Sequence, residues 1–155
     1  MNDEEYMKLA LLQAKKAYKK GDVPVGAVIV CENKVIAKAY NKKEKKQNSL
    51  FHAEILAINK ACKKLKSFRL DNCELFVTLE PCLMCSGAII ASRFKRVVFG
   101  AKDKNYGCAG TKYDFLQDKT FEYLINHEGG VLEEECSDLI KSFFSNIRKN
   151  KRKNK

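Results

Sequence analysis

The clearest candidates for chemistry are two cysteines in the segment EPCLMCSG, residues 80–87. Cys82 and Cys85 could form a disulfide, a redox dithiol, half of a structural zinc site or part of a catalytic metal site. The chain has seven cysteines, an odd number, and no second C-x-x-C pair. A structural zinc site built from cysteines alone is therefore disfavoured, and the redox and catalytic-metal interpretations stay open for a thiol pair at a helix start.

A second part of the pattern lies upstream of the cysteines. His52 opens a predicted helix as His52-Ala53-Glu54, 30 residues before Cys82. One imidazole and two thiolates fill three positions of a tetrahedral zinc site and leave the fourth open, as in catalytic sites. Zinc lowers the pKa of water in that position towards about 7, and Glu54 has the chemistry of a general base. H-x-E followed by P-C-x-x-C is the established signature of zinc nucleobase deaminases.

The second histidine and most other cysteines suggest structure rather than chemistry. We expect His127, which precedes Glu-Gly-Gly, to be an ordinary surface histidine. Cysteines on apolar helix faces or in strands behave as small buried hydrophobes. The cysteines in such predicted positions are Cys31, Cys62, Cys73 and Cys136.

Helices and strands alternate in the predicted secondary structure around these motifs. Apolar residues at helical spacing predict helices, and short β-branched runs predict strands. The predicted helices cover 4–20, 52–66, 82–93 and a C-terminal stretch that begins near residue 132. The predicted strands are a hairpin over 23–41, then 73–79, 96–101 and a last strand at either 123–126 or 129–133. We expect the Lys-rich segment 41–51 to be a loop.

A hairpin followed by β-α alternation predicts an α/β fold, with a mixed sheet and helices on both of its faces. At 155 residues the chain fits a single domain, residues 1–155. Its N-terminus lacks the basic start and apolar core of a signal peptide, and its apolar runs are too short to span a bilayer. We therefore expect a cytoplasmic protein with no membrane partner.

The net charge of +11 indicates a polyanionic partner. Thirty basic residues face nineteen acidic ones, and much of the excess gathers in three clusters. These are 41–48, 63–69 and a basic C-terminal tail over about 148–155. No cluster lies on an amphipathic helix with bulky Trp or Phe opposite, so nucleic acid is favoured over a membrane surface.

Together these motifs make the chain resemble the bacterial tRNA-specific adenosine deaminases of the cytidine deaminase-like superfamily over nearly its whole length. Besides HAE and EPCLMC, the resemblance rests on DVPVGAVIV (22–30), LFVTLEPCLMCSGAIIASRFKRVVFGAKD (75–103), GCAG (107–110) and GGVLEEEC (129–136). It implies a three-layer α/β/α fold with a mixed five-stranded sheet, a homodimer, and one Zn²⁺ per subunit at His52, Cys82 and Cys85. The implied reaction is hydrolytic deamination of the wobble adenosine, the first anticodon position of a tRNA (usually an arginine tRNA), to inosine with release of ammonia.

The resemblance also implies substrate contacts. Asn41 matches the family asparagine that contacts the flipped base, Val25 a position on the pocket wall, and Asp103 an acidic residue close to the anticodon backbone. Judged without the resemblance, Asn41 is a turn residue at a strand end and Val25 a core valine. The departures from the family pattern near the substrate mouth are Phe51, Asn105 and Tyr106.

Two other functions fit parts of this pattern. A free-base aminohydrolase of the same fold, acting on guanine or cytosine, can carry the same H-A-E and P-C-x-x-C set, but it has no need of basic clusters. A non-catalytic, zinc-stabilised RNA-binding module explains the charge but not Glu54 beside an open coordination position. An anticodon loop fits best, because it offers an unpaired base and phosphates for the basic residues to neutralise.

Overall fold

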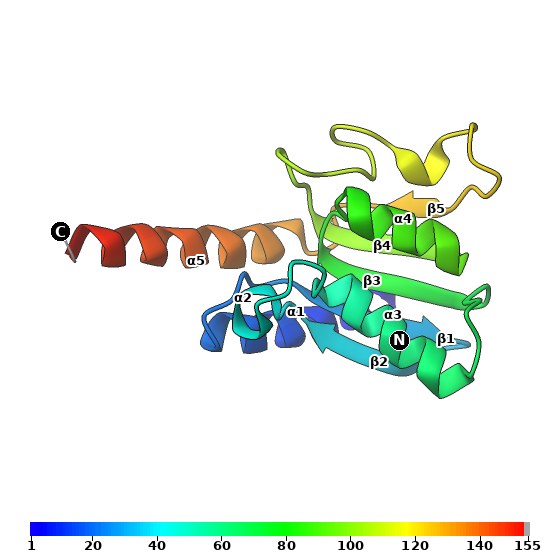
Figure 1. Cartoon of the computed structure of the whole chain (residues 1–155), viewed down its shortest axis with the longest axis horizontal. Helices are drawn as coiled ribbons and strands as arrows, with labels where there is room; N and C mark the ends of the chain where they lie inside the picture. Colours follow the sequence, from blue (N-terminus) through cyan, green and yellow to red (C-terminus); the bar gives the residue numbers. More distant parts are fainter. Residues whose placement is uncertain (154–155) are drawn as a thin grey trace.

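Five strands form one mixed sheet at the centre of the fold (Figure 1). The computed structural model describes residues 1–153. The strands are β1 Gly26–Cys31, β2 Lys34–Tyr40, β3 Cys73–Leu79, β4 Arg96–Ala101 and β5 Asn126–Glu128. Their order is β2-β1-β3-β4-β5, antiparallel in the first two pairings and parallel in the last two. The predicted mixed sheet of five strands is confirmed.

Helices cover both faces of the sheet, which gives the three layers that the resemblance implied (Figure 1). The helices are α1 Asp3–Lys19, α2 Lys43–Lys46, α3 Ala53–Leu65, α4 Leu83–Ser92 and α5 Glu133–Lys153, with a 3-10 turn, η1, at Phe115–Gln117. Buried side chains of α3 and α4 pack on one face, and those of α1 and α5 pack on the other.

Successive side chains of the central strands point to opposite faces of the sheet, and both faces are buried, so the sequences of these strands are continuous apolar runs. In β1, Ala27 and Ile29 belong to the core under α3 and α4, whereas Val28 and Val30 belong to the core under α1. A strand buried on both faces needs apolar residues at every position, because neither face meets water. The segment GAVIV is therefore the signature of a central strand.

The strand ends that lead to the H-A-E and P-C-x-x-C motifs of this chain lie at one edge of the sheet. Gly26 at the start of β1 pairs with Tyr40 at the end of β2, and Leu79 at the end of β3 pairs with Ala101 at the end of β4. Ala27 pairs with Val77, which brings the two sets of ends together. We call this edge the site edge, because the loops and helix starts described below all leave the sheet there.

Close packing of α1 on the sheet depends on Gly26. A Cβ at this position would lie 2.0 Å from the carbonyl oxygen of Ala10 and 2.4 Å from the backbone nitrogen of Ala14. Only glycine allows the strand backbone to approach the helix this closely. Asn2 caps α1 by accepting a hydrogen bond from the backbone N–H of Glu5 at 2.9 Å.

Helix α5 packs its first half against the sheet and then projects from the body (Figure 1). Its first turn holds Glu133, Glu134 and Glu135 and its last described turn is basic, as the helix dipole favours. The predicted basic tail is thus helical over 148–153, and residues 154–155 lie outside the described residues. Within residues 1–153, no helix is both long enough and apolar enough to cross a membrane.

Two local predictions were wrong. The Lys-rich segment 41–51 contains a short helix, α2, because the buried Asp22 carboxylate accepts the N–H groups of its first residues. The fifth strand falls at Asn126–Glu128, which shares only Asn126 with the predicted strand 123–126 and does not reach 129–133. It ends where Gly129 packs against the ring of Phe99, whose atoms a Cβ would meet at 2.4 Å.

Candidate metal centre and active site

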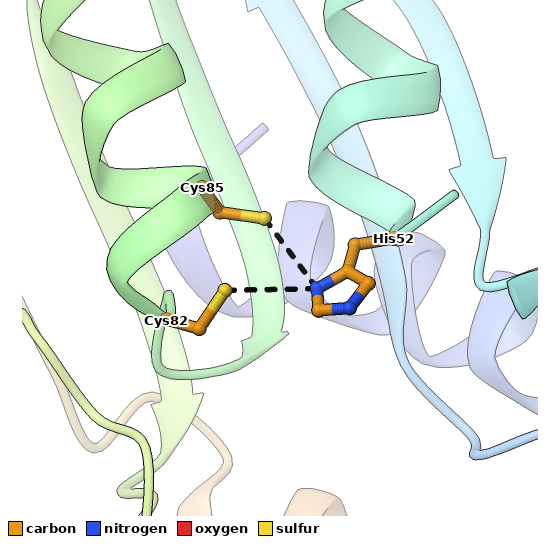
Figure 2. A group of neighbouring side chains, drawn as sticks. All are labelled: His52, Cys82 and Cys85. Atoms are coloured by element: carbon orange, nitrogen blue, oxygen red, sulfur yellow. Dashed lines mark hydrogen bonds between the residues drawn. The ribbon is translucent and has the colours of Figure 1, made fainter. Parts of the chain in front are cut away.

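Two helix starts at the site edge bring the predicted metal ligands together. His52 is the N-cap residue of α3, Cys82 is the N-cap residue of α4, and Cys85 lies in the first turn of α4. Figure 2 shows their side chains pointing toward one another across the gap between the two helices. Both helix N-termini carry positive partial charge, which favours thiolates at this point.

The donor atoms have the spacing that a tetrahedral metal requires. Each Sγ atom lies 3.7 Å from Nδ1 of His52, and all three donor atoms lie within 4.8 Å of one another. For Zn–S bonds of about 2.3 Å and Zn–N bonds of about 2.0–2.1 Å, tetrahedral geometry puts sulfur and nitrogen about 3.6 Å apart. The residues therefore fit a zinc ion, with three protein ligands and one open position.

The electrostatics of the cluster also suit a cation. A hydrogen bond from the Cys85 thiol, assisted by His52, lowers the pKa of Cys82 to about 4. The same hydrogen bond and burial raise the pKa of Cys85. The hydrogen bond to Cys82 raises the pKa of His52. Metal binding to such a set displaces protons and replaces them with one compact positive charge.

A buried carboxyl group stands beside the ligands. Glu54 lies in the first turn of α3 and is only 4% exposed. Burial, followed by the negative charge of Cys82, raises the pKa of Glu54 to about 7. A carboxyl group that can both hold and release a proton near neutral pH has the property of a general acid–base catalyst.

The candidate substrate residues lie on two segments of the site edge. Asn41 follows β2 and donates its backbone N–H to the carbonyl oxygen of Val25 at 3.0 Å, so these two residues are neighbours. Val25 is also part of the buried core, as judged without the resemblance. Asp103 lies on the loop after β4, where Oδ1 accepts the N–H groups of Asn105 and Tyr106 and closes a turn.

Glu80 is a site residue that the sequence interpretation missed. It is 2% exposed, and its carboxylate accepts backbone N–H groups of Asp103 at 3.1 Å and of Ala109 and Thr111 at 3.0 Å, besides the Thr111 hydroxyl. Gly107 makes room for it, because a Cβ there would lie 2.5 Å from Cδ of Glu80. The residue before Pro81-Cys82 thus holds the loop after β4. An acidic residue directly after an apolar strand was the available signal.

Asp22 plays the corresponding part for the loop after β2. It is 1% exposed; Oδ1 accepts the N–H of Val23 and Nδ2 of Asn41, and Oδ2 accepts the N–H groups of Glu44 and Lys45. Asn41 is therefore oriented by a buried carboxylate and is more than a turn residue. The signal was an acidic residue placed just before the Val-Pro-Val-Gly segment.

The prediction for His127 was wrong. Its side chain is 17% exposed, and Nε2 lies 2.9 Å from both carboxylate oxygens of Asp114. This pair fastens β5 to the segment before η1, which is a structural role. All seven cysteines are free thiols. Burial is confirmed for Cys73 and Cys136, while Cys31 and Cys62 are half-buried against the core.

Comparisons with known proteins agree with this geometry. The model of the MafB19-like deaminase family matches residues 1–148. The tRNA-specific adenosine deaminase of Bacillus subtilis (strain 168) is 49% identical over 150 residues, which cover 97% of this chain and 93% of that protein. A solved structure from studies of A-to-I editing by tRNA:A34 deaminases has a TM-score of 0.84 at 36% identity, covering 87% of this chain and 98% of that one. The guanine deaminase of Nitrosomonas europaea has a TM-score of 0.79 at 24% identity, covering 90% and 83%, and shares the fold alone.

The three-layer fold and the family match define a deaminase, a hydrolase of the cytidine deaminase-like fold. Such a fold supports several activities, so the family within it is assigned from relatives that match over the full length of the chain. The chain belongs to the family of the tRNA-specific adenosine deaminases.

Proposed function

We propose that this chain converts the wobble adenosine of a tRNA to inosine by zinc-dependent hydrolysis. The observation that carries the proposal is the convergence of His52, Cys82 and Cys85 beside the buried Glu54. The substrate class comes from the relatives, among them the Bacillus subtilis protein named for tRNA-specific adenosine deamination. The net charge of +11 supports an RNA substrate over a free base.

In this proposal, Nδ1 of His52 and the Sγ atoms of Cys82 and Cys85 hold one Zn²⁺ per subunit. The ion supplies Lewis acidity that makes water nucleophilic at neutral pH. Glu54 accepts one proton from the attacking water and passes it to the ring nitrogen beside the C–NH₂ carbon. It then accepts the remaining proton of the added hydroxyl group and gives it to the amino group, which leaves as ammonia. Adenosine and water yield inosine and ammonia, so the reaction needs no further co-reactant.

The substrate contacts and the assembly are parts of the same proposal. Asn41 and Val25 line the pocket for the flipped adenine, with Asn41 oriented by Asp22. Asp103 lies near the anticodon backbone on the loop that Glu80 holds. Residues 1–155 act as a single deaminase domain in a cytoplasmic homodimer whose partners are anticodon stem-loops of tRNA.

Replacing Glu54 by Gln tests the mechanism, because Gln keeps the shape of the side chain but cannot carry the proton. We expect inosine formation in an anticodon stem-loop to fall by about 10²–10⁴-fold. Zinc content, measured by atomic absorption, and RNA binding should stay near those of the parent. The exposed Glu134→Gln is the matched control. Unchanged inosine formation in Glu54→Gln would show that another group moves the proton.

The substrate class needs a separate test. Purified zinc-loaded protein is incubated with an anticodon stem-loop and, in parallel, with free guanine and free cytosine, and released ammonia is measured. We expect ammonia from the stem-loop alone. Ammonia released only from a free base would replace this proposal with the free-base alternative.

A further inference from the structure

Beside the active site lies a small cavity lined by lysines. Its volume is about 110 Å³, and Lys20 at the end of α1 faces Lys42, Lys45 and Lys46 of the loop after β2. Tyr40, the last residue of β2, forms part of the wall. Four ammonium groups around one cavity repel one another, so the free protein carries an unfavourable electrostatic interaction at this point.

The acidic residue that lines this cavity offsets only part of the lysine charge and forms no direct ion pair with it. Both oxygens of Asp22 are engaged, since they accept the N–H groups of Val23, Glu44 and Lys45 and Nδ2 of Asn41. Within residues 1–153, no ion pair involves a lysine of the cavity. Asp22 therefore shapes the loop, and its single negative charge leaves the cavity, with its four lysines, net positive.

Tyr40 orders two of the lysines. Nζ of Lys20 donates a hydrogen bond to the Tyr40 hydroxyl at 2.8 Å, and Nζ of Lys42 lies 5.0 Å from the centre of its ring. Cation–π attraction at this distance holds the ammonium group against the aromatic face. The hydrogen bond from Lys20 and the charges of Lys20 and Lys42 lower the pKa of Tyr40, as expected where positive charge surrounds the hydroxyl group.

The cavity opens at the same edge of the sheet as the metal ligands. Tyr40 pairs with Gly26 at the site edge. The backbone N–H of Lys42 donates to the carbonyl oxygen of Phe51 at 3.0 Å, and Phe51 directly precedes the ligand His52. A nucleic-acid strand whose base enters the metal site therefore has its backbone within reach of this loop.

We propose that the cavity formed by Lys20, Tyr40 and Lys42 binds a backbone phosphate of the RNA substrate, outside the nucleotide that is deaminated. The inference rests on the proposed function for its partner, and it adds the anchoring site. The phosphodiester anion relieves the repulsion among the lysines, and ammonium groups held by Tyr40 lose little freedom on binding. Lys45 and Lys46 also line the cavity and add positive charge.

Salt dependence of RNA binding tests the site. Binding of a labelled anticodon stem-loop to the full-length, zinc-loaded protein is measured by fluorescence anisotropy between about 50 and 200 mM salt. Loss of one phosphate contact reduces the slope of log K against log salt by about 0.7–0.9. We expect this reduction in Lys42→Gln and in Lys20→Gln. The ratio of the parent's affinity to that of each variant should therefore fall about threefold as salt rises over that range.

The matched control is Lys34→Gln, an exposed lysine at the start of β2, at the opposite edge of the sheet. It should keep the slope of the parent. A second measurement replaces single phosphates of the stem-loop by uncharged methylphosphonates. One replacement should weaken the parent several-fold and weaken Lys42→Gln less, because that variant has already lost one of the two lysines that contact this phosphate.

The outcomes separate this inference from the proposed function. A parent protein that binds the stem-loop with the expected slopes but forms no inosine would contradict the function and keep the phosphate site. Equal slopes for Lys42→Gln and Lys34→Gln, in a parent that forms inosine, would overturn the phosphate site alone. Polyglutamate that competes as well as RNA for the parent, but not for Lys42→Gln, would assign the cavity to acidic peptides instead.

Discussion

Replacing Glu80 by Gln tests whether one buried carboxylate holds the loop after β4 against the metal-binding motif. Oε1 accepts the N–H of Asp103 at 3.1 Å and the hydroxyl of Thr111. Oε2 accepts the N–H groups of Ala109 and Thr111, each at 3.0 Å. Gln has the same shape but offers one acceptor oxygen in place of two.

The cost follows from the better of the two orientations of the amide. With Nε2 at the position of Oε1, the Thr111 hydroxyl can turn and accept, so only the N–H of Asp103 loses its partner. A buried donor without a partner costs about 1–3 kcal/mol, and the loss of charge from the remaining hydrogen bonds costs about 1 kcal/mol more. We therefore expect Glu80→Gln to lower the free energy of unfolding by about 2–4 kcal/mol. Glu80→Ala should lower the free energy of unfolding further, because three backbone N–H groups are then left without an acceptor.

Urea unfolding of the zinc-loaded protein measures this change, with Glu134→Gln as the exposed control. A domain of ordinary stability, about 5–15 kcal/mol, still folds with such a loss. The backbone amides of Ala109 and Thr111 should exchange faster with deuterium, and KM for the stem-loop should rise more than kcat falls. An unchanged unfolding midpoint with protected amides would refute the reasoning, since other contacts would then hold the loop.

The remaining predictions concern packing, charge and metal. Gly26→Ala should prevent α1 from docking, because the added Cβ would lie 2.0 Å from a helix carbonyl oxygen. Gly87→Ala, where the added Cβ meets nothing within 4 Å, should raise the free energy of unfolding by about 0.5–1 kcal/mol. Thermal melts compare the two variants. Arg96→Ala breaks ion pairs to α1, β3 and β5 and should lower the free energy of unfolding by about 1–3 kcal/mol. Arg69→Ala removes an exposed ion pair and should leave the urea midpoint unchanged. Chelation should lower Tm and added zinc should restore it, and a metal-independent Tm would contradict the site.

The metal ligands were predictable because local sequence encodes the helix starts that carry them. His52 and Cys82 are both N-cap residues, and apolar periodicity after each one marks where its helix begins. Three donors of the right types, with Glu54 in the first turn of the first of these helices, then need only a sheet that brings the two helix starts to one edge. The β-α alternation predicted that sheet, so fold and ligand set follow from the same pattern.

The loop anchors were not predictable, because nothing local marks their partners. Asp22 binds N–H groups 22 and 23 residues downstream, and Glu80 binds those 23 to 31 residues downstream. Backbone N–H groups are common to nearly all residue types, so the partner segments carry no sequence signature. The His127 error has the same origin, since its partner Asp114 lies across a turn that has no periodic pattern.

The same two anchors hold the loops beside the metal site without using the side chains of those loops. The loops after β2 and β4 flank the metal site, and each is held through its backbone by a buried carboxylate of the neighbouring framework, Asp22 or Glu80. Side chains on these loops, such as Lys42 and Asp103, can then change without releasing the loop. Proline is the exception at the donor positions, because it has no N–H.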